Sequence, residues 1–183
     1  MARVPYLDSH ELDPGDSDLL DSTLQSDRTL NLNRTLANNP EILRGFRSFF
    51  GAIWDHSGLE DRQRELVILT VASEFRSEYE WQQHTNVGSN AGLTSEEIAA
   101  IARDDRSVFG QRERALMAYA RAVARGRLTD PLHAAVGEFL DDETVVGVAT
   151  IASSYVGVAL LLDALGVEIE PGEAFVGWDP RKP

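Results

Sequence analysis

The sequence predicts an all-α protein. Apolar residues recur at intervals of three and four along several stretches, as in Ile42, Leu43, Phe46, Phe49 and Phe50, and this is the period of a helix with one buried face. Helix-capping residues stand where such stretches begin, and glycines stand where they end. No stretch shows a convincing strand pattern. A length of 183 residues suits one domain with a substantial core.

The helices can be placed in chain order from their start and stop signals. Pro40 suits a first helical turn, because the N–H group that proline lacks would be unbonded there in any case. Ser77 and Thr94 each precede a glutamate by three residues, which is the pattern of a capping box. The predicted helical ranges are 18–24, 30–37, 40–57, 60–75, 78–91, 95–103, 111–125, 130–140 and 142–165.

The stretch from Arg64 to Leu93 predicts the centre of the fold as two consecutive helices. The first of them is apolar on nearly every side, so we expect it to be buried. Around this hairpin the sequence predicts a single domain over 1–183. Its parts are an N-terminal arm (1–38), a core region (39–103), C-terminal helices (104–167) and a tail (168–183).

Composition excludes several classes of function. The sequence contains no cysteine, which excludes disulfides, thiolate metal sites and thiol redox chemistry. The formal net charge of −13 opposes binding to nucleic acid and to anionic membranes, because both require clustered basic residues. Lys182 is the single lysine. This composition favours a halophilic protein, whose charges are screened in molar salt, and the alternative is an acidic protein from a genome that favours arginine codons.

One stretch requires a membrane check. Residues from Val145 to Leu162 carry no charge and are long enough to span a bilayer. Small and polar residues such as Gly147 and Ser153 interrupt the stretch, and basic flanks are missing, so we expect a buried helix packed through small residues. The stretch from Met1 to Leu20 lacks the apolar core of a secretory signal, and the expected location is the cytoplasm.

Polar residues follow one face of the predicted helix 78–91. Ser77, Glu80 and His84 are spaced three and four apart, and the same face continues into apolar residues, so it should point inward. On the preceding helix, Glu65 lies on a face that is otherwise apolar. Two adjacent antiparallel helices can bring Glu65 against Glu80 and His84.

These residues form the predicted catalytic site, with His84, Glu80 and Glu65 in acid/base roles. A histidine between two carboxylates can exchange protons near neutral pH. The structural alternative is a buried Glu–His pair in which Glu80 caps its own helix, because structural ion pairs perturb pKa values equally well. The sequence predicts no cofactor and no metal, although Glu65, Glu80 and His84 would chemically suit Zn or Mn.

Several aromatic residues surround the predicted site in sequence. Ser77, Tyr79 and Trp81 are the predicted substrate-binding residues. The alternative for Tyr79 and Trp81, and for Trp54, is core packing; in a functional role they would form an apolar lid over the Glu–His patch.

Three segments resemble a known family. E-L-V-I-L-T-V-A (65–72), S-E-Y-E-W-Q-Q-H (77–84) and A-G-L-T (91–94) are similar to the carboxymuconolactone decarboxylase / alkylhydroperoxidase D-like (AhpD-like) superfamily. The resemblance covers roughly 39–103, with weaker likeness in R-V-P-Y-L near the N-terminus and in the last long helix. It implies an AhpD-like helical bundle built around a central helical hairpin.

The resemblance also shows what this chain lacks. Peroxidase members carry a glutamate, a Cys-x-x-Cys pair and a histidine; Glu65 and His84 stand in the matching positions, whereas Ser77 and Glu80 stand where the cysteines would be. Tyr79 replaces the relaying histidine. Peroxide reduction in that family requires a thiolate and a resolving thiol, so thiol peroxidase activity is excluded.

The decarboxylase branch does not depend on cysteine and has a Glu-x-x-x-His pair that Glu80 and His84 resemble. A carboxylate-rich lactone would require convergent positive charge, and Arg62, Arg64 and Arg76 are neighbours only in sequence. We therefore expect a non-redox acid/base enzyme, a possible lyase, acting on a small organic substrate.

The alternative is a non-catalytic relative that binds a small molecule or serves as an oligomeric structural protein. The resemblance implies a ring-like homo-oligomer, a trimer or hexamer, with a dimer as the smaller option. The helix from 145 to 165, rich in small residues, would be an interface element.

Overall fold

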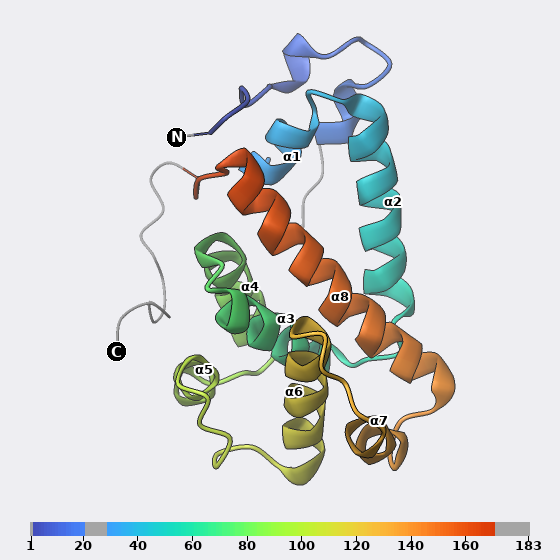
Figure 1. The fold of residues 1–183 in the computed structure, drawn as a ribbon. Coiled ribbons are helices and arrows are strands. Elements are labelled where there is room, and N and C mark those ends of the chain that lie inside the picture. Colours follow the sequence, from blue (N-terminus) through green and yellow to red (C-terminus); the bar gives the residue numbers. More distant parts are fainter. Residues whose placement is uncertain (1, 21–28, 171–183) are drawn as a thin grey trace. The chain divides into compact units, whose positions relative to one another are not determined.

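The computed structural model describes residues 2–20 and 29–170. Within these ranges the chain forms eight α-helices and two short 3-10 helices and contains no strand, which confirms the all-α prediction (Figure 1). The 3-10 helices are η1 (Ser9–Glu11) and η2 (Ser17–Leu20). The α-helices are α1 (Asn31–Leu36), α2 (Pro40–His56), α3 (Asp61–Phe75), α4 (Glu78–Asn90), α5 (Ser95–Ala102), α6 (Gln111–Ala124), α7 (Asp130–Gly137) and α8 (Asp142–Leu165).

Most predicted boundaries lie within two residues of the observed ones, and two predicted helices differ more. The predicted helix 18–24 is a 3-10 turn as far as Leu20, and its remainder lies outside the described residues. The predicted helix 130–140 ends at Gly137. On α2 the apolar face is only partly covered, since Ile42 and Phe49 are 56% and 49% exposed.

Contacts divide the described chain into two compact units. One unit holds the residues up to Ala52 together with those from Leu160 onward, and the other holds Ile53–Ala159. The single domain over 1–183 therefore stays a prediction. All residues of the predicted site belong to the second unit.

In the first unit, the N-terminal arm is tied to the end of α8. The Arg3 guanidinium donates to the carbonyls of Asp163 and Ala164, where a cation also suits the negative end of the helix dipole. The backbone N–H of Glu168 donates to the Tyr6 hydroxyl at 2.8 Å. Arg3 and Tyr6 therefore hold the N-terminal arm against the C-terminal end of α8 and the residues that follow it.

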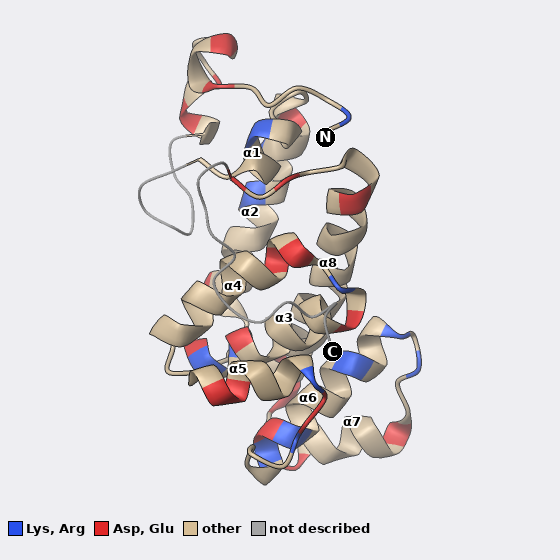
Figure 2. Ribbon diagram, turned by 90° about the vertical axis from the view of Figure 1, so that its left-hand side faces the viewer, with Lys and Arg blue, Asp and Glu red and all other residues tan. Residues whose placement is uncertain are grey.

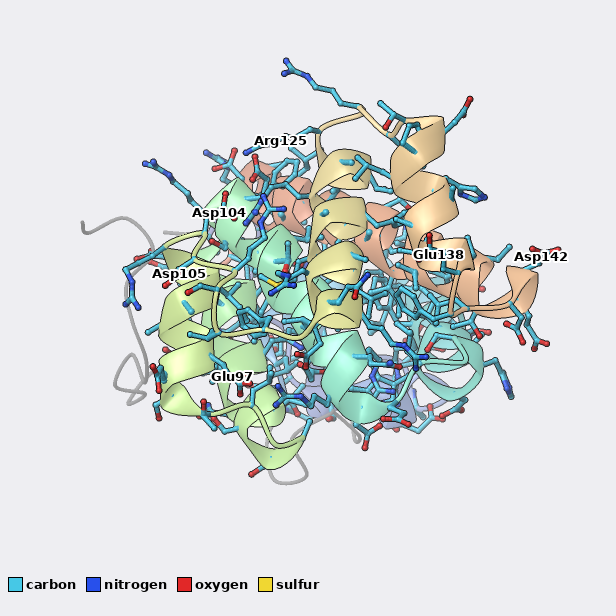
Figure 3. All side chains as sticks on the ribbon, turned by 90° about the horizontal axis from the view of Figure 1, so that it is seen from below. Glu97, Asp104, Asp105, Arg125, Glu138 and Asp142 are labelled. Atoms are coloured by element: carbon cyan, nitrogen blue, oxygen red, sulfur yellow. The ribbon has the colours of Figure 1, made fainter. Side chains whose placement is uncertain are left out.

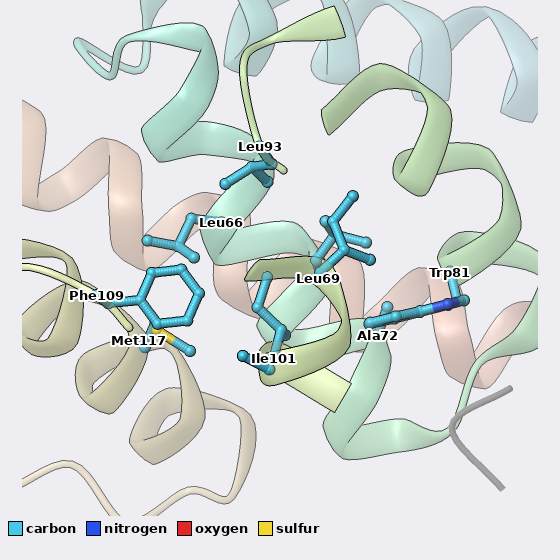
Figure 4. Close-up of a cluster of buried hydrophobic side chains, with 10 residues drawn as sticks. Leu66, Leu69, Ala72, Trp81, Leu93, Ile101, Phe109 and Met117 are labelled. Carbon is cyan, nitrogen blue, oxygen red and sulfur yellow. The ribbon is translucent and has the colours of Figure 1, made fainter. Parts of the chain in front are cut away.

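In the second unit, α3 is the central helix. Every residue from Arg64 to Ala72 is buried, as the apolar pattern predicted, and α3 packs against α4, α5 and α6 (Figure 1). An apolar cluster fills the space between these four helices (Figure 4). Its members are Leu66, Leu69, Ala72, Trp81, Leu93, Ile98, Ala100, Ile101, Phe109 and Met117.

A tight turn joins α3 to α4. Arg76 adopts φ 51° and ψ 38°, a left-handed conformation that closes the C-terminus of α3. The N–H groups of Arg76 and Ser77 donate to the carbonyls of Ser73 and Ala72. Because the turn is so short, α4 folds directly back along α3, and the polar face of α4 meets the buried face of its partner.

Charged residues connect α3 to α5 and α6. The Arg62 guanidinium donates to Glu97 at 2.5 Å and to Glu113 at 3.0 Å, and it also bonds the carbonyl of Gly92 at 2.6 Å. Figure 2 shows both signs of charge at the first turn of α6, whereas α8 carries no charge between its first turn and Asp163.

The helix α8 is long and apolar enough to cross a membrane, but half of its most apolar window is buried in the protein. It packs closely at Gly147, where an added Cβ would lie 2.0 Å from the carbonyl oxygen of Ser57. These two features match the expected buried helix that packs through small residues.

Candidate active site

The hairpin brings Glu65 of α3 and His84 of α4 into direct contact. Glu65 Oε2 lies 2.8 Å from His84 Nδ1, and the two residues are 0% and 5% exposed. The expected meeting of these side chains is therefore observed. The contact forms because Glu65 lies on the buried face of α3 and His84 lies opposite it, about two turns into α4.

This contact constrains the roles of the two imidazole nitrogens. A carboxylate only accepts hydrogen bonds, so if Glu65 is in its carboxylate form, His84 Nδ1 is the donor of this hydrogen bond. His84 Nε2 makes no hydrogen bond with the described residues. In the neutral imidazole, Nε2 then holds the lone pair, which is the form that accepts a proton.

Glu80 lies on the same helix one turn before His84, and its environment is different. The residue is 3% exposed, and its carboxyl group forms no ion pair with the described residues. Burial raises the pKa of Glu80 to about 8, and the Ser77 hydroxyl acts in the opposite direction. Near neutral pH this carboxyl group is therefore protonated.

The predicted capping box at the start of α4 is wrong. Ser77 is the N-cap residue, but its side chain accepts no hydrogen bond from the backbone of the first turn. Glu80 is turned into the protein instead of back toward its N-cap. The matching box at Thr94 does form, because Glu97 lies at the surface of α5 and can reach the Thr94 N–H at 2.8 Å.

Arg64 is a member of this site that the sequence did not assign. Its side chain is 7% exposed, and its Nε lies 3.9 Å from Glu65 Oε1. The guanidinium stacks over the Trp54 ring at 4.1 Å and donates to Asp61 at 2.7 Å. Glu65 thus lies between the Arg64 guanidinium and the His84 imidazole.

Two aromatic rings contact His84. The Tyr155 ring from α8 meets it edge to face, with centroids 5.0 Å apart and planes at 81°, and the Trp54 ring lies 6.1 Å away. Burial raises the pKa of Tyr155, and the charges of Glu65 and Glu80 raise it further. Trp54 was among the predicted lid residues, whereas Tyr155 was not assigned.

The three predicted substrate-binding residues have different surroundings. Ser77 is half-buried, and Tyr79 is 6% exposed. Trp81 is fully buried in the apolar cluster beside Ala72 (Figure 4). Packing is thus the evident role of Trp81, and substrate contact by these residues stays a prediction.

The structure also bears on two other candidate sites. In the described part of the chain, no three His, Asp or Glu side chains gather closely enough to hold a metal ion, so the geometry gives the metal alternative no support. An open hollow of about 370 Å³ lies at the ends of α3 and α6, lined by Glu74, Phe75, Ala124, Arg125 and Arg127 (Arg125 is labelled in Figure 3). There Arg125 donates to Glu74 at 2.6 and 2.9 Å, so these charges satisfy each other.

Comparisons with known proteins give a match to one family model and a set of solved structures with a similar fold. Residues 40–122 match the model of the carboxymuconolactone decarboxylase family. No curated protein sequence matches the chain. A peroxidase-related protein with an alkylhydroperoxidase AhpD core, from Ralstonia eutropha, is similar at 18% identity and a TM-score of 0.82, with 93% of each chain covered.

Two further solved structures are similar. A peroxidase-related protein from Silicibacter sp. has 14% identity and a TM-score of 0.82, and the match covers 92% of this chain and 91% of that one. The debrominase Bmp8 in complex with 2,3,4-tribromopyrrole has 15% identity and a TM-score of 0.75, with 86% and 87% covered. At such low identity these likenesses establish the AhpD-like fold and no activity.

Proposed function

We propose that this chain is a non-redox acid/base enzyme that acts on a small organic substrate, starting from the match of residues 40–122 to the carboxymuconolactone decarboxylase family model. The observation that carries the proposal is the difference between two buried carboxyl groups. Glu65 is paired with His84 and faces Arg64, whereas Glu80 has no ion-pair partner among the described residues and a pKa of about 8. Environments that separate two carboxyl groups in this way are typical of acid/base sites.

In this proposal each residue has a distinct role. His84 accepts a proton from the substrate at Nε2, because Glu65 occupies Nδ1. Glu65 orients the imidazole and stabilises the imidazolium that forms. Glu80, protonated near neutral pH, donates a proton or a hydrogen bond to the substrate. No thiol takes part, since the sequence has no cysteine.

A small substrate agrees with what the fold accommodates elsewhere, since the debrominase structure of similar fold holds 2,3,4-tribromopyrrole. Arg64 supplies the buried positive charge that an organic acid would require, although Asp61 and Glu65 already share it. Small lactones and keto acids are therefore the compounds to screen first.

The test is a turnover screen with matched variants. His84→Gln should lower kcat/KM on any substrate found by about 10²-fold or more, because general base catalysis contributes at that level. Glu65→Gln should also lower it, since the imidazole loses its orienting carboxylate. His56→Gln is the control, because His56 lies exposed at the end of α2. Activity that survives the His84 substitution would overturn the proposal.

The burial of the cluster favours a second candidate, a non-catalytic relative. Glu65, Glu80 and His84 are all at most 5% exposed, as in a structural Glu–His pair. This candidate predicts that Glu65→Gln and His84→Gln lower the melting temperature or weaken ligand binding while no compound in the screen turns over. Turnover that depends on His84 would refute it.

The same relative would act through an oligomer, and α8 offers an interface. Val146 and Leu160 are 64% and 57% exposed, on the part of this helix that carries no charge between its first turn and Asp163. We expect a trimer, hexamer or dimer in light scattering at high salt. Val146→Asp should dissociate it, whereas Val108→Asp, at an exposed loop position outside α8, should not. A monomeric wild-type protein would contradict this expectation.

A further inference from the structure

Tyr155 brings a third helix to the Glu65–His84 pair. It lies in the middle of α8, is 4% exposed, and meets the His84 ring edge to face at 5.0 Å. This is an attractive geometry for two aromatic rings. The contact comes from a part of the chain far from the α3–α4 hairpin, so the hairpin alone does not determine how the imidazole is held.

The orientation of the His84 ring depends on the contacts at its edges and faces. Rotation about the bond between Cβ and the ring is broad and roughly two-fold in free histidine, so a flipped ring would present carbon instead of Nδ1 to Glu65. The hydrogen bond at 2.8 Å opposes this flip from one edge of the ring. The Trp54 ring is farther away, at 6.1 Å, and tilted, which leaves Tyr155 as the nearer aromatic contact.

We propose that Tyr155 is a positioning residue for His84, whose ring holds the imidazole in the orientation that pairs Nδ1 with Glu65. The inference rests on the proposed function, in which the other ring nitrogen accepts the proton. The phenol suits this position because burial keeps it protonated, so it adds no charge beside the imidazole. It acts through His84 and is not itself assigned a contact with the substrate.

The test is the tautomer of His84, read from the ¹⁵N NMR shifts of its two ring nitrogens at a pH where the ring is neutral. The wild-type protein should show His84 with protonated Nδ1 and unprotonated Nε2. Tyr155→Phe keeps the ring and should preserve this state. Tyr155→Met fills similar space without a ring and should give a mixture of tautomers, with kcat/KM lower by about 10²-fold through misplacement of the base.

The chain supplies a matched control. Tyr119 is also buried and lies near a histidine, with its ring 6.2 Å from that of His133. Tyr119→Met should leave the His84 signals in place. A Tyr155→Met protein that is folded by circular dichroism and keeps the wild-type tautomer would overturn the proposal. So would mixed tautomers in the wild-type protein, a result that needs no variant to fold.

The measurement also separates this inference from the proposed function. The NMR result does not depend on turnover, so a tautomer that responds to Tyr155 in a protein without activity would refute the enzyme and leave the positioning role standing. Turnover that depends on His84 while the tautomer ignores Tyr155 would refute the positioning role and leave the enzyme standing.

Discussion

Replacement of Glu80 by glutamine should change how stability depends on pH. Burial raises the pKa of Glu80 from 4.5 to about 8. In the unfolded chain this carboxyl group ionises near pH 4.5, whereas in the folded protein it keeps its proton up to about pH 8. Between these values ionisation favours the unfolded state. The contribution of Glu80 to stability is therefore fully present below pH 4.5 and is lost as the pH rises through 8.

The size of the effect follows from the shift. One pKa unit corresponds to about 1.4 kcal/mol, so ionisation of Glu80 should remove about 4 kcal/mol of unfolding free energy between pH 5 and pH 9. The Glu80→Gln protein has a neutral side chain of the same shape and should lack this loss. At pH 9 it should be the more stable protein, and at pH 5 the two should be similar.

Urea unfolding at pH 5, 7 and 9 measures the difference. With a slope of about 2 kcal/mol per molar, the wild-type midpoint should fall by about 2 M across this range relative to the Glu80→Gln midpoint. Glu96→Gln is the matched control, since Glu96 is exposed on α5 and its replacement should leave the wild-type pH dependence intact. Parallel pH profiles for wild type and Glu80→Gln would refute the reasoning, because they would show that Glu80 ionises normally in the folded protein.

Two further predictions concern helix packing and helix caps. Gly147→Ala should destabilise the protein by about 3 kcal/mol, because the new methyl group would meet the Ser57 carbonyl. Gly157→Ala on the same helix meets nothing and should stabilise the protein by about 1 kcal/mol. A loss of stability at Gly157 equal to that at Gly147 would contradict this prediction. Thr94→Ala should lower the free energy of unfolding, measured by thermal unfolding, by about 1 kcal/mol, and Ser77→Ala should lower it much less, because of these two side chains only that of Thr94 caps its helix. Equal losses of stability in the two variants would show that the Ser77 cap exists in solution.

The helices were predictable because their signals are local. Glycines with positive φ stand just beyond α6 and α8, at Gly126 and Gly166, as the sequence indicated. The central place of α3 also followed, because apolar residues on every side of a helix leave no face for solvent. These inferences require only neighbours along the chain, and for this reason they agree with the structure.

The capping box at Ser77 shows where local reasoning ends. The pattern of a hydroxyl residue and a glutamate three residues later is the same at Ser77 and at Thr94, yet only Thr94 forms the box. The two glutamates differ in whether their side of the helix is packed against other helices. Glu97 remains near the surface and can bend back to its N-cap, whereas Glu80 is on the side of α4 that packs inward. Tertiary packing thus overrides a valid local signal, and it leaves Glu80 buried without an ion-pair partner among the described residues.

The same limit explains the residues that completed the site. Arg64 joins Glu65 because the end of α2 places Trp54 under its guanidinium, and Tyr155 reaches His84 because α8 packs there. Neither contact has a signature in the spacing of residues along one helix. Both contacts nevertheless affect the proposed chemistry. Arg64 places a positive charge beside Glu65, and Tyr155 restricts the orientation of the His84 imidazole. A hairpin that carried only Glu65, Glu80 and His84 would hold the same functional groups without fixing their protonation or their direction, so the activity proposed for this protein depends on the helices that surround the motif as much as on the motif.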